Sequence, residues 1–341
     1  MIHKGMGGLT IALDAMGGDL APKEIIAGAL LARDELGLQA TLVGRSADIS
    51  RELNELGQEV STWPVVDAPD VIGMSEEGAR AVRSHPESSI TVGARLVKEG
   101  KADAFVSAGN TGAAMAASLL SWGRIRGVKR PAIAAVLPPV SRPCILLDVG
   151  ANADCRPEYL RQFALMGTAY ARLWIDERPI KVGLLNIGSE ESKGNELARE
   201  AFALLSQTSG IDFLGNIEGR DITAGVAQVV VTDGFTGNVA LKLIEGVASY
   251  ITGLVGMALA EAPTDAVMQI LPALASVKRE LDYEETGGAV LLGVKGVCVI
   301  GHGSSKAKAV MNAIRVAGDA VRGGLVARIE SLTARGNPEE S

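Results

Sequence analysis

Six clusters of glycine and small polar residues recur along the chain, and each follows a run of apolar, mostly β-branched residues. Such a cluster directs backbone N–H groups to one point, and a helix that begins there adds about half a positive charge at its N-terminus. One cluster alone is better explained as a helix cap with a turn glycine. Six together favour a site for an anion such as phosphate. The clusters occupy residues 14–19, 107–112, 148–152, 186–191, 232–238 and 301–305.

Three charged or titratable side chains in or beside these clusters are candidates for chemistry. His302 stands between two glycines, which offer little packing to a core side chain, so we expect it to contact a ligand or exchange a proton. Asp233 follows three valines in a glycine-containing turn, where it would orient a ligand or cap the next helix. Lys193 and the amide of Asn195 would bind the anion, or would lie in a solvated surface loop.

Signatures of several other enzyme classes are missing from the sequence. No GxGxxG follows a strand and no GxxxxGK(S/T) occurs, so neither NAD nor ATP is indicated. There is no GxSxG or HExxH motif, and with 3 histidines in the chain a Ser-His-Asp triad would depend on His302. The 3 cysteines form no CxxC pair. We therefore expect no cofactor, no metal site and no disulfide framework.

The charge balance argues against nucleic acid as a partner. The 341 residues include 33 Lys+Arg and 40 Asp+Glu, a formal net charge of −7, whereas nucleic-acid binders usually present a basic face to the phosphates. Hydrophobic residues make up 47% of the chain, which is enough for a large core. The first residues lack the apolar stretch of a signal peptide and the cysteines fit a reducing compartment, so we expect a cytoplasmic protein.

The elements that hold the six clusters alternate between strand-like and helix-like runs, which is typical of an α/β fold. We expect a mainly parallel, Rossmann-like layered sheet with helices on both faces, and all six clusters at the edge formed by the carboxyl ends of its strands. Residues 9–13 are predicted to form the first strand, and helices are predicted to begin at Pro22 and Pro157. Residues 1–335 would form one α/β unit or two intertwined lobes, and residues 336–341 a frayed tail.

Six ordered motifs of this sequence resemble those of the PlsX family of phosphate acyltransferases, over residues 9 to about 330. The motifs are DAMGGD (14–19), SAGNTGA (107–113), LDVGAN (147–152), GLLNIG with KGNE (183–188 and 193–196), TDGFTGNV (232–239) and HGSS (302–305). The resemblance implies a fold related to phosphotransacetylase and isopropylmalate dehydrogenase.

The resemblance also implies a reaction and its partners. A long-chain fatty acyl group would move from acyl carrier protein to inorganic phosphate, giving acyl phosphate for phospholipid synthesis. A homodimer, a cytoplasmic location with peripheral membrane contact, and a functional link to a membrane glycerol-3-phosphate acyltransferase are implied as well. A CoA-dependent phosphotransacetylase and a non-catalytic phosphate sensor of the same fold are the alternatives.

This reaction assigns roles to the cluster residues. Phosphate is itself a nucleophile and a thiolate with a parent pKa of about 8.5 leaves readily, so no protein nucleophile is needed. The protein must instead hold phosphate beside the carbonyl and stabilise the oxyanion. We expect Asp233, His302 and Lys193 to act in catalysis, with Asp233 orienting and His302 donating a proton or hydrogen bond. The expected phosphate and oxyanion ligands are Asn110, Thr111, Gly112, Asn152, Asn195, Asn238, Ser304 and Ser305.

An acidic carrier protein would need a cationic surface on this net-negative chain. Residues 124–130 carry four cations and follow the helix expected after the 107–112 cluster. This run would either dock the carrier protein or form a solvated turn. The predicted docking residues are Arg124, Arg126, Lys129 and Arg130.

Two uncharged runs resemble membrane spans, which need about 20 mainly apolar residues. Residues 104–123 contain polar side chains that hydrocarbon would leave unpaired, and residues 246–260 are too short, so we expect neither to cross a membrane. Residues 239–277 are the most apolar helical region, and Pro263 and Pro272 argue against one continuous helix. The region would form core or a dimer interface, or a protruding helical pair whose apolar tip takes up an acyl chain or touches lipid.

Overall fold

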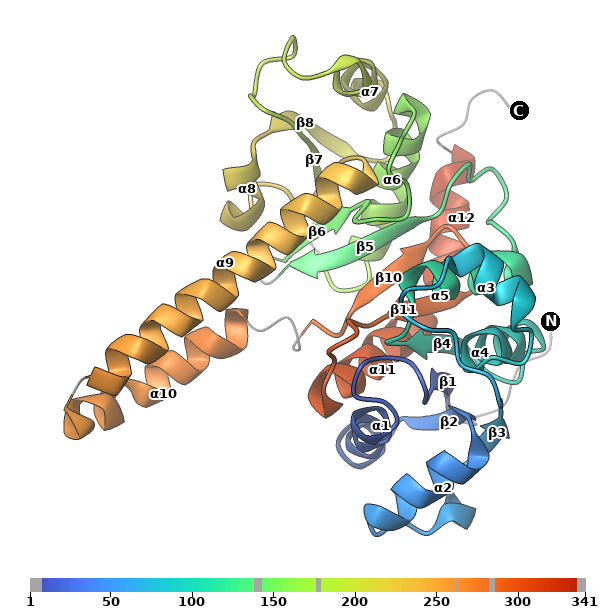
Figure 1. The fold of residues 1–341 in the computed structure, drawn as a ribbon. Helices are drawn as coiled ribbons and strands as arrows, with labels where there is room; N and C mark the ends of the chain where they lie inside the picture. The colour runs from blue at the N-terminus through green and yellow to red at the C-terminus, as the bar shows by residue number, and fades with distance from the viewer. Residues whose placement is uncertain (1–7, 138–142, 176–178, 262, 282–285, 336–341) are drawn as a thin grey trace.

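The computed structural model describes residues 8–137, 143–175, 179–261, 263–281 and 286–335. The predicted frayed tail at 336–341 lies outside these residues. An 11-stranded sheet runs through the molecule (Figure 1). Its strands are β1 (Thr10–Asp14), β2 (Gln39–Gly44), β3 (Val65–Asp67), β4 (Ala104–Ser107), β5 (Ala132–Leu137), β6 (Cys144–Leu147), β7 (Lys181–Leu185), β8 (Asp212–Ile217), β9 (Val229–Val231), β10 (Ala289–Leu292) and β11 (Val297–Ile300).

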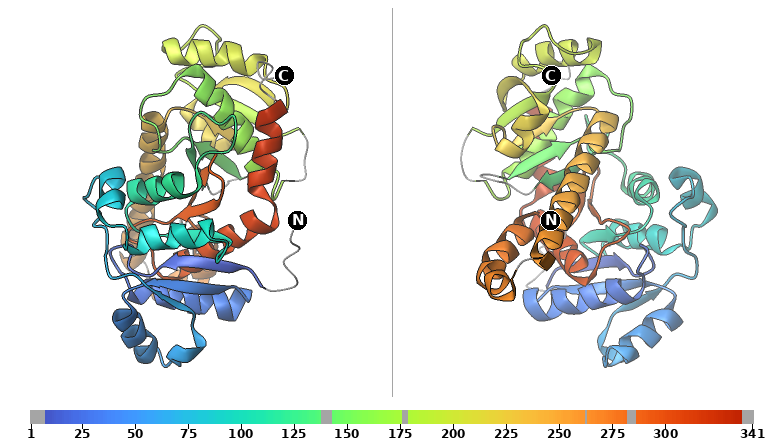
Figure 2. Two further views of the ribbon diagram at one scale, coloured as in Figure 1. Left: turned by 90° about the vertical axis from the view of Figure 1, so that its right-hand side faces the viewer. Right: turned by 60° about the vertical axis from the view of Figure 1, so that its left-hand side comes forward.

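Helices cover both faces of this sheet, as the sequence predicts (Figures 1 and 2). One face packs against α1 (Lys23–Leu36), α2 (Ser46–Glu55), α6 (Pro157–Ala171), α7 (Glu196–Ser206), α11 (Ala307–Arg322) and α12 (Leu325–Arg335). The other packs against α3 (Gly78–Ser84), α4 (Ser89–Lys98), α5 (Thr111–Trp122), α8 (Gly219–Ala224) and α9 (Gly234–Glu261). The remaining helices are the 3-10 turn η1 (Val60–Thr62) and α10 (Thr264–Leu281).

The predicted local elements are confirmed where the sequence carries strong signals. The first strand is β1, and α6 begins at Pro157. Pro22 is the N-cap of α1, which buries Ile25, Ile26 and other apolar side chains at helical spacing and ends where Gly37 takes the left-handed conformation, with φ 64°.

Most neighbouring strands are parallel, as predicted, but the two halves of the sheet run in opposite directions. The strands β1, β2, β3, β4 and β11 are parallel to one another. β10 is antiparallel to both β11 and β5, and β5 is antiparallel to β6. Consequently β6, β9, β7 and β8, which are mutually parallel, point opposite to β1.

The prediction that all six clusters meet at one edge of the sheet is therefore wrong. The clusters at 14–19, 107–112 and 301–305 lie at one edge, because they follow β1, β4 and β11. The clusters at 148–152, 186–191 and 232–238 follow β6, β7 and β9 at the opposite edge. A buried strand has the same apolar residues whether it runs parallel or antiparallel to its neighbours. The sequence pattern therefore could not reveal the antiparallel pairing of β10 and β5, the two strands between the halves.

Both hydrophobic cores contain residues from the beginning, the middle and the end of the chain. We therefore propose that residues 1–335 unfold as one unit rather than as two lobes. A single transition in calorimetry, with equal calorimetric and van't Hoff enthalpies, would support this.

The apolar region at 239–277 forms a projecting helical pair, α9 and α10 (Figures 1 and 2). Pro263 lies between the two helices, whereas Pro272 lies inside α10 and does not end it. The interpretation of this region as core is wrong, because large apolar side chains along α9 are exposed, among them Leu243 at 65% and Tyr250 at 66%.

The view that residues 246–260 are too short for a span also needs correction. They belong to α9, which has 28 residues and contains a window of mean hydropathy 1.6, none of it buried. Among the described residues α9 alone has the length and composition of a membrane-crossing helix, which is weak evidence by itself.

Candidate active site

A cavity of about 830 Å³ lies between α9 and the sheet. It joins loops from both edges, because α9 starts at the edge where β6 ends and passes over the sheet (Figure 2). Thr111 and His302 line it from the loops after β4 and β11, whereas Gly150 and Asn238 line it from the other half. The structure thus assembles in one cavity clusters that lie at opposite edges of the sheet.

His302 has a defined orientation in this lining. Its Nδ1 lies 2.7 Å from the Oγ of Ser304 and accepts a hydrogen bond from the backbone N–H of Ser304 at 3.3 Å. In the tautomer whose Nδ1 accepts this hydrogen bond, the ring proton lies on Nε2. His302 can therefore donate an Nε2–H hydrogen bond to an oxygen in the cavity, and Ser304 acts by fixing the ring.

Lys306 lines the same end of the cavity, directly before α11. The first backbone N–H of α11, that of Ala307, donates to the Glu24 carboxylate at 2.9 Å. Because a protein carboxylate already occupies this helix N-terminus, the Lys306 ammonium is the stronger attraction for an anion here.

Three predicted site residues cap helices. The Asn110 Oδ1 accepts from the N–H of Ala113 at 2.9 Å, and the Asn195 Oδ1 accepts from Ala198 at 2.9 Å. Asp233 accepts from the N–H of Thr236 at 2.8 Å with one carboxylate oxygen and from its hydroxyl at 2.8 Å with the other. Each side chain satisfies N–H groups that the helix itself leaves without partners.

Asn110 also anchors a neighbouring loop. Its Nδ2 lies within hydrogen-bonding distance of three carbonyl oxygens, those of Gly73, Met74 and Glu76, at 2.8 to 3.2 Å. With both ends of its amide engaged and only 6% of its surface exposed, Asn110 holds the loop beside Thr111. Thr111, which lines the cavity, is the group in this cluster placed to meet a ligand, and Gly112 follows it in the first turn of α5.

Asn152 belongs to a hydrogen-bonded turn centred on the buried carboxylate of Asp148. Asp148 accepts from the backbone N–H groups of Ile133, Ala151 and Asn152 at 2.7 to 3.0 Å, and from the Asn152 amide at 2.9 Å. The same amide donates to the carbonyl of Pro131 at 2.8 Å. Burial nevertheless raises the pKa of Asp148 above its ordinary value. Gly234 must be small, because a Cβ there would lie 2.8 Å from the Asp148 carboxylate.

Cys155, near this turn, is a thiol rather than a thiolate. Burial, with the nearby Asp148 charge, raises its pKa to about 12, and its Sγ lies 3.6 Å from the Asn152 carbonyl oxygen. A protonated thiol is a poor nucleophile. Among the described cysteines, none shows the low pKa of a reactive thiol.

Lys193 and Asn195 lie apart from this cavity, in the loop between β7 and α7. The Lys193 ammonium is 4.0 Å from the carboxylate of Glu190, and about half of its side chain is exposed. The assignment of Lys193 and Asn195 to the phosphate site stays a prediction.

Among the other predicted residues, four line the cavity: Thr111, Asn238, His302 and Ser305. Ser304 contacts His302.

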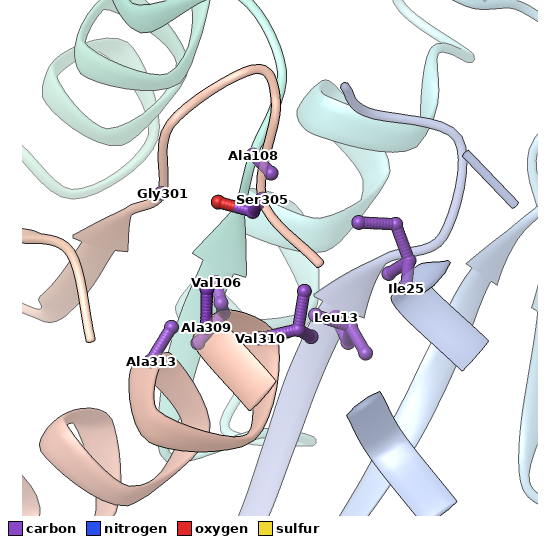
Figure 3. Close-up of a pocket in the computed structure, with 9 residues that line it drawn as sticks. All are labelled: Leu13, Ile25, Val106, Ala108, Gly301, Ser305, Ala309, Val310 and Ala313. Atoms are coloured by element: carbon purple, nitrogen blue, oxygen red, sulfur yellow. The ribbon is translucent and has the colours of Figure 1, made fainter. Parts of the chain in front are cut away.

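Ser305 separates this cavity from a much smaller void (Figure 3). The void measures about 10 Å³ and is bordered by aliphatic side chains such as Leu13, Ile25 and Val310. A water needs roughly 10–15 Å³ and two or more polar partners. The void is therefore a packing gap beneath Ser305, not a ligand site.

Sequence reasoning did not select Lys306 or the apolar wall of the cavity. Lys306 does carry a signal: a cation immediately before a helix opposes the helix dipole, so its placement suggests a role other than stability. The apolar wall carries no comparable signal, because alternate residues of β5 that face the cavity resemble ordinary core residues.

The basic run at 124–130 is an ordered loop with exposed cations. Ile125 and Val128 are buried, and the buried Gln162 of α6 accepts from the Lys129 N–H at 2.7 Å and donates to the carbonyl of Gly127 at 2.8 Å. The guanidinium of Arg124 donates to the Lys129 carbonyl. The run carries four cations, and the backbone N–H of Lys295 donates to the carbonyl of Gly123 just before it.

This chain is similar to known proteins over nearly its whole length. The family model described as "Fatty acid synthesis protein" matches residues 9–328. The phosphate acyltransferase of Desulforamulus reducens is 52% identical over 329 residues, covering 95% of this chain and 97% of that protein. That of Picosynechococcus sp. is 48% identical over 328 residues, covering 95% and 90%.

Solved structures with a similar fold include a phosphotransacetylase from Streptococcus pyogenes, with a TM-score of 0.63, 16% identity and coverage of 92% and 94%. A 4-hydroxythreonine-4-phosphate dehydrogenase from Klebsiella pneumoniae aligns with a TM-score of 0.54, 14% identity and coverage of 91% and 98%. These likenesses confirm the predicted phosphotransacetylase-like α/β fold. With the family model and the relatives matching nearly the whole length, the chain belongs to the fatty acid synthesis protein (PlsX) family and is a phosphate acyltransferase.

Proposed function

We propose that this phosphate acyltransferase takes a long-chain fatty acyl group from acyl carrier protein and gives acyl phosphate for phospholipid synthesis. The observation that carries the proposal is the cavity, which has a cation and an oriented histidine at one end and apolar walls beyond them. Phosphate would bind at the polar end, and no metal or cofactor is invoked.

In the proposed reaction a phosphate oxygen attacks the thioester carbonyl carbon. A C–O bond forms, the C–S bond breaks, and the thiolate leaves and takes up a proton. Lys306 holds the phosphate, and the Nε2–H of His302 together with Thr111 donates to the oxygen that gains charge. Asp233 acts as a positioning residue, because it caps the helix that carries Asn238 into the cavity.

The acidic surface expected of a carrier protein would be attracted by the exposed cations of the ordered basic loop. This loop is the observation that supports docking here. Arg124, Arg126, Lys129 and Arg130 are exposed at the start of β5, the strand that forms one wall of the cavity. We propose that carrier protein binds there and delivers its acyl group into the cavity.

The exposed apolar helices support proposals on assembly and location. We propose that α9 and α10 form a homodimer interface, whose tip makes peripheral contact with the membrane from the cytoplasmic side. There the acyl phosphate would reach a membrane glycerol-3-phosphate acyltransferase.

The test combines purified protein, palmitoyl-acyl carrier protein and phosphate, without added metal or nucleotide. We expect palmitoyl phosphate, trapped as the hydroxamate, and an equal amount of free carrier thiol. Thiol release without acyl phosphate would indicate a thioesterase, and binding of phosphate without turnover would indicate a sensor. Preference for acetyl-CoA over palmitoyl-acyl carrier protein would identify a phosphotransacetylase, the alternative that the shared fold keeps open.

A further inference from the structure

The cavity contains an apolar compartment beyond the polar groups that act in the proposed reaction. One wall is β5, whose alternate residues face the cavity, and the opposite wall is the inner face of α9. The apolar side chains of the two walls are Ile133, Ala135 and Leu137 on β5, and Leu241, Ile244 and Ala248 on α9.

The apolar compartment is continuous with the polar end. Along the lining, the apolar Ile300 at the end of β11 is followed by Gly301 and then by His302. A molecule with a polar head at His302 and Lys306 would therefore place its tail against β5 and α9. The charged pair on α9, Lys242 and Glu245, is neutralised by a 2.8 Å contact, so neither charge faces the tail alone.

We infer that this compartment is the acyl-chain site and that two alanines, Ala135 on β5 and Ala248 on α9, limit the chain length it accepts. The inference rests on the proposed function, since it places the acyl tail of the same substrate. The cavity of about 830 Å³ falls within the roughly 300–1,000 Å³ of sites that enclose drug-sized ligands. A short acetyl group would leave most of this space empty.

The inference is tested by filling the compartment from each wall. Ala248→Phe and Ala135→Leu should shorten the space for the tail and leave the polar end intact. Each buried methylene contributes about fourfold to binding, so a tail displaced by two methylenes should lose about 15-fold in kcat/KM with the palmitoyl donor. With the octanoyl donor the loss should stay below about twofold.

A second readout does not depend on turnover. Calorimetric binding of hexadecyl phosphate and octyl phosphate, as unreactive analogues of the product, should show the same selective loss for the longer chain. Ala260→Phe is the matched control, because Ala260 is an exposed residue at the far end of α9, outside the cavity lining. It should keep the wild-type chain-length profile.

The outcomes separate the inference from the proposed function. If no donor gives acyl phosphate but the two wall variants lose hexadecyl phosphate selectively, the tail site stands and the proposed reaction fails. If Ala248→Phe and Ala135→Leu, folded by circular dichroism and unfolding midpoint, treat both chain lengths as the wild type does or lose both equally, the tail binds elsewhere.

Discussion

The hydroxyl of Ser107, at the end of β4, donates a 2.7 Å hydrogen bond to the carboxylate of Asp14, at the end of the neighbouring β1. Both side chains are fully buried. The same Ser107 oxygen accepts from the N–H of Gly109 at 3.0 Å, and Asp14 accepts from the N–H of Met16 at 3.1 Å. This chain of hydrogen bonds fixes two glycine-containing loops against each other at one edge of the sheet.

Replacing Ser107 with Ala should destabilise the fold. The change removes one of several donors to the buried Asp14 carboxylate and leaves the Gly109 N–H without its partner, and an unsatisfied buried group costs about 1–3 kcal/mol. Unfolding in urea measures the loss. Ser118→Ala is the matched control, since Ser118 is equally buried but its hydroxyl bonds the Ala114 carbonyl within its own helix. Equal losses for the two variants would contradict a special role for the Asp14–Ser107 pair.

The contribution of Asp14 to the stability of the protein should fall as the pH rises above the ordinary Asp pKa of about 3.9. Burial raises the pKa of Asp14 in the folded chain, although hydrogen bonds from Ser89 and Ser107 oppose the shift. Between the unfolded and folded pKa values the folded chain retains a proton that the unfolded chain has released, so the free energy of unfolding decreases with pH.

Ser107→Ala should raise the folded pKa of Asp14 further, because it removes a donor to the charged carboxylate. The destabilisation of this variant should therefore grow as the pH rises through this interval, as urea unfolding at several pH values would show. A constant difference between the variant and the wild type would mean that Asp14 has the same protonation in both.

Much of the fold was predictable because its local signals are strong. The prolines at the starts of α1 and α6 and the apolar run of β1 predict those elements close to their observed limits. The layered α/β class follows from alternating strand-like and helix-like runs. The opposite direction of the two halves could not be predicted, because β5 and β10 are apolar runs whose pairing is set by tertiary contacts.

The candidate site was predictable only in part, for a related physical reason. Residue types at strand ends identified His302 and Thr111, which do line the cavity. The same types are also favoured helix caps, and Asn110, Asn195 and Asp233 do cap helices. The wall alanines depend on how α9 lies over the sheet, which no local pattern encodes.

Two lysines, Lys193 and Lys306, are candidates for the cation that binds phosphate, and a variant of each distinguishes them. The sequence motif assigns Lys193, whereas Lys306 lines the cavity. Losing a charge-assisted hydrogen bond costs about 1.5–3 kcal/mol, or roughly 10- to 150-fold. We expect Lys306→Gln to raise the phosphate KM by this factor and Lys193→Gln to change it by less than about twofold. The reverse result would place phosphate at the loop between β7 and α7.

Replacing Arg126 with Glu should impair use of the carrier protein at low salt. A single reversed rim charge is worth about 1 kcal/mol, or roughly fivefold in kcat/KM, and the defect should shrink as salt shortens the Debye length below about 8 Å. Palmitoyl-CoA should be used normally. The control is Arg51→Glu, an exposed arginine that pairs with Asp48 on α2, beside β2 and β3 at one end of the sheet and away from β5. Equal defects with both thioesters would make Arg126 a structural residue.

The outer face of α9 should control assembly. Large exposed apolar surfaces usually mark interaction sites, and Leu243, 65% exposed, lies on this face. Leu243→Asp would place a charge in the proposed dimer interface, where it would lose its hydration without a partner. Sedimentation should therefore show a dimer for the wild type and a monomer for this variant.

The control variant is Leu120→Asp, at a 52% exposed leucine of α5, and it should stay dimeric. A monomeric wild type that pellets with phospholipid vesicles, and fails to do so after Leu243→Asp, would instead assign the whole face to lipid.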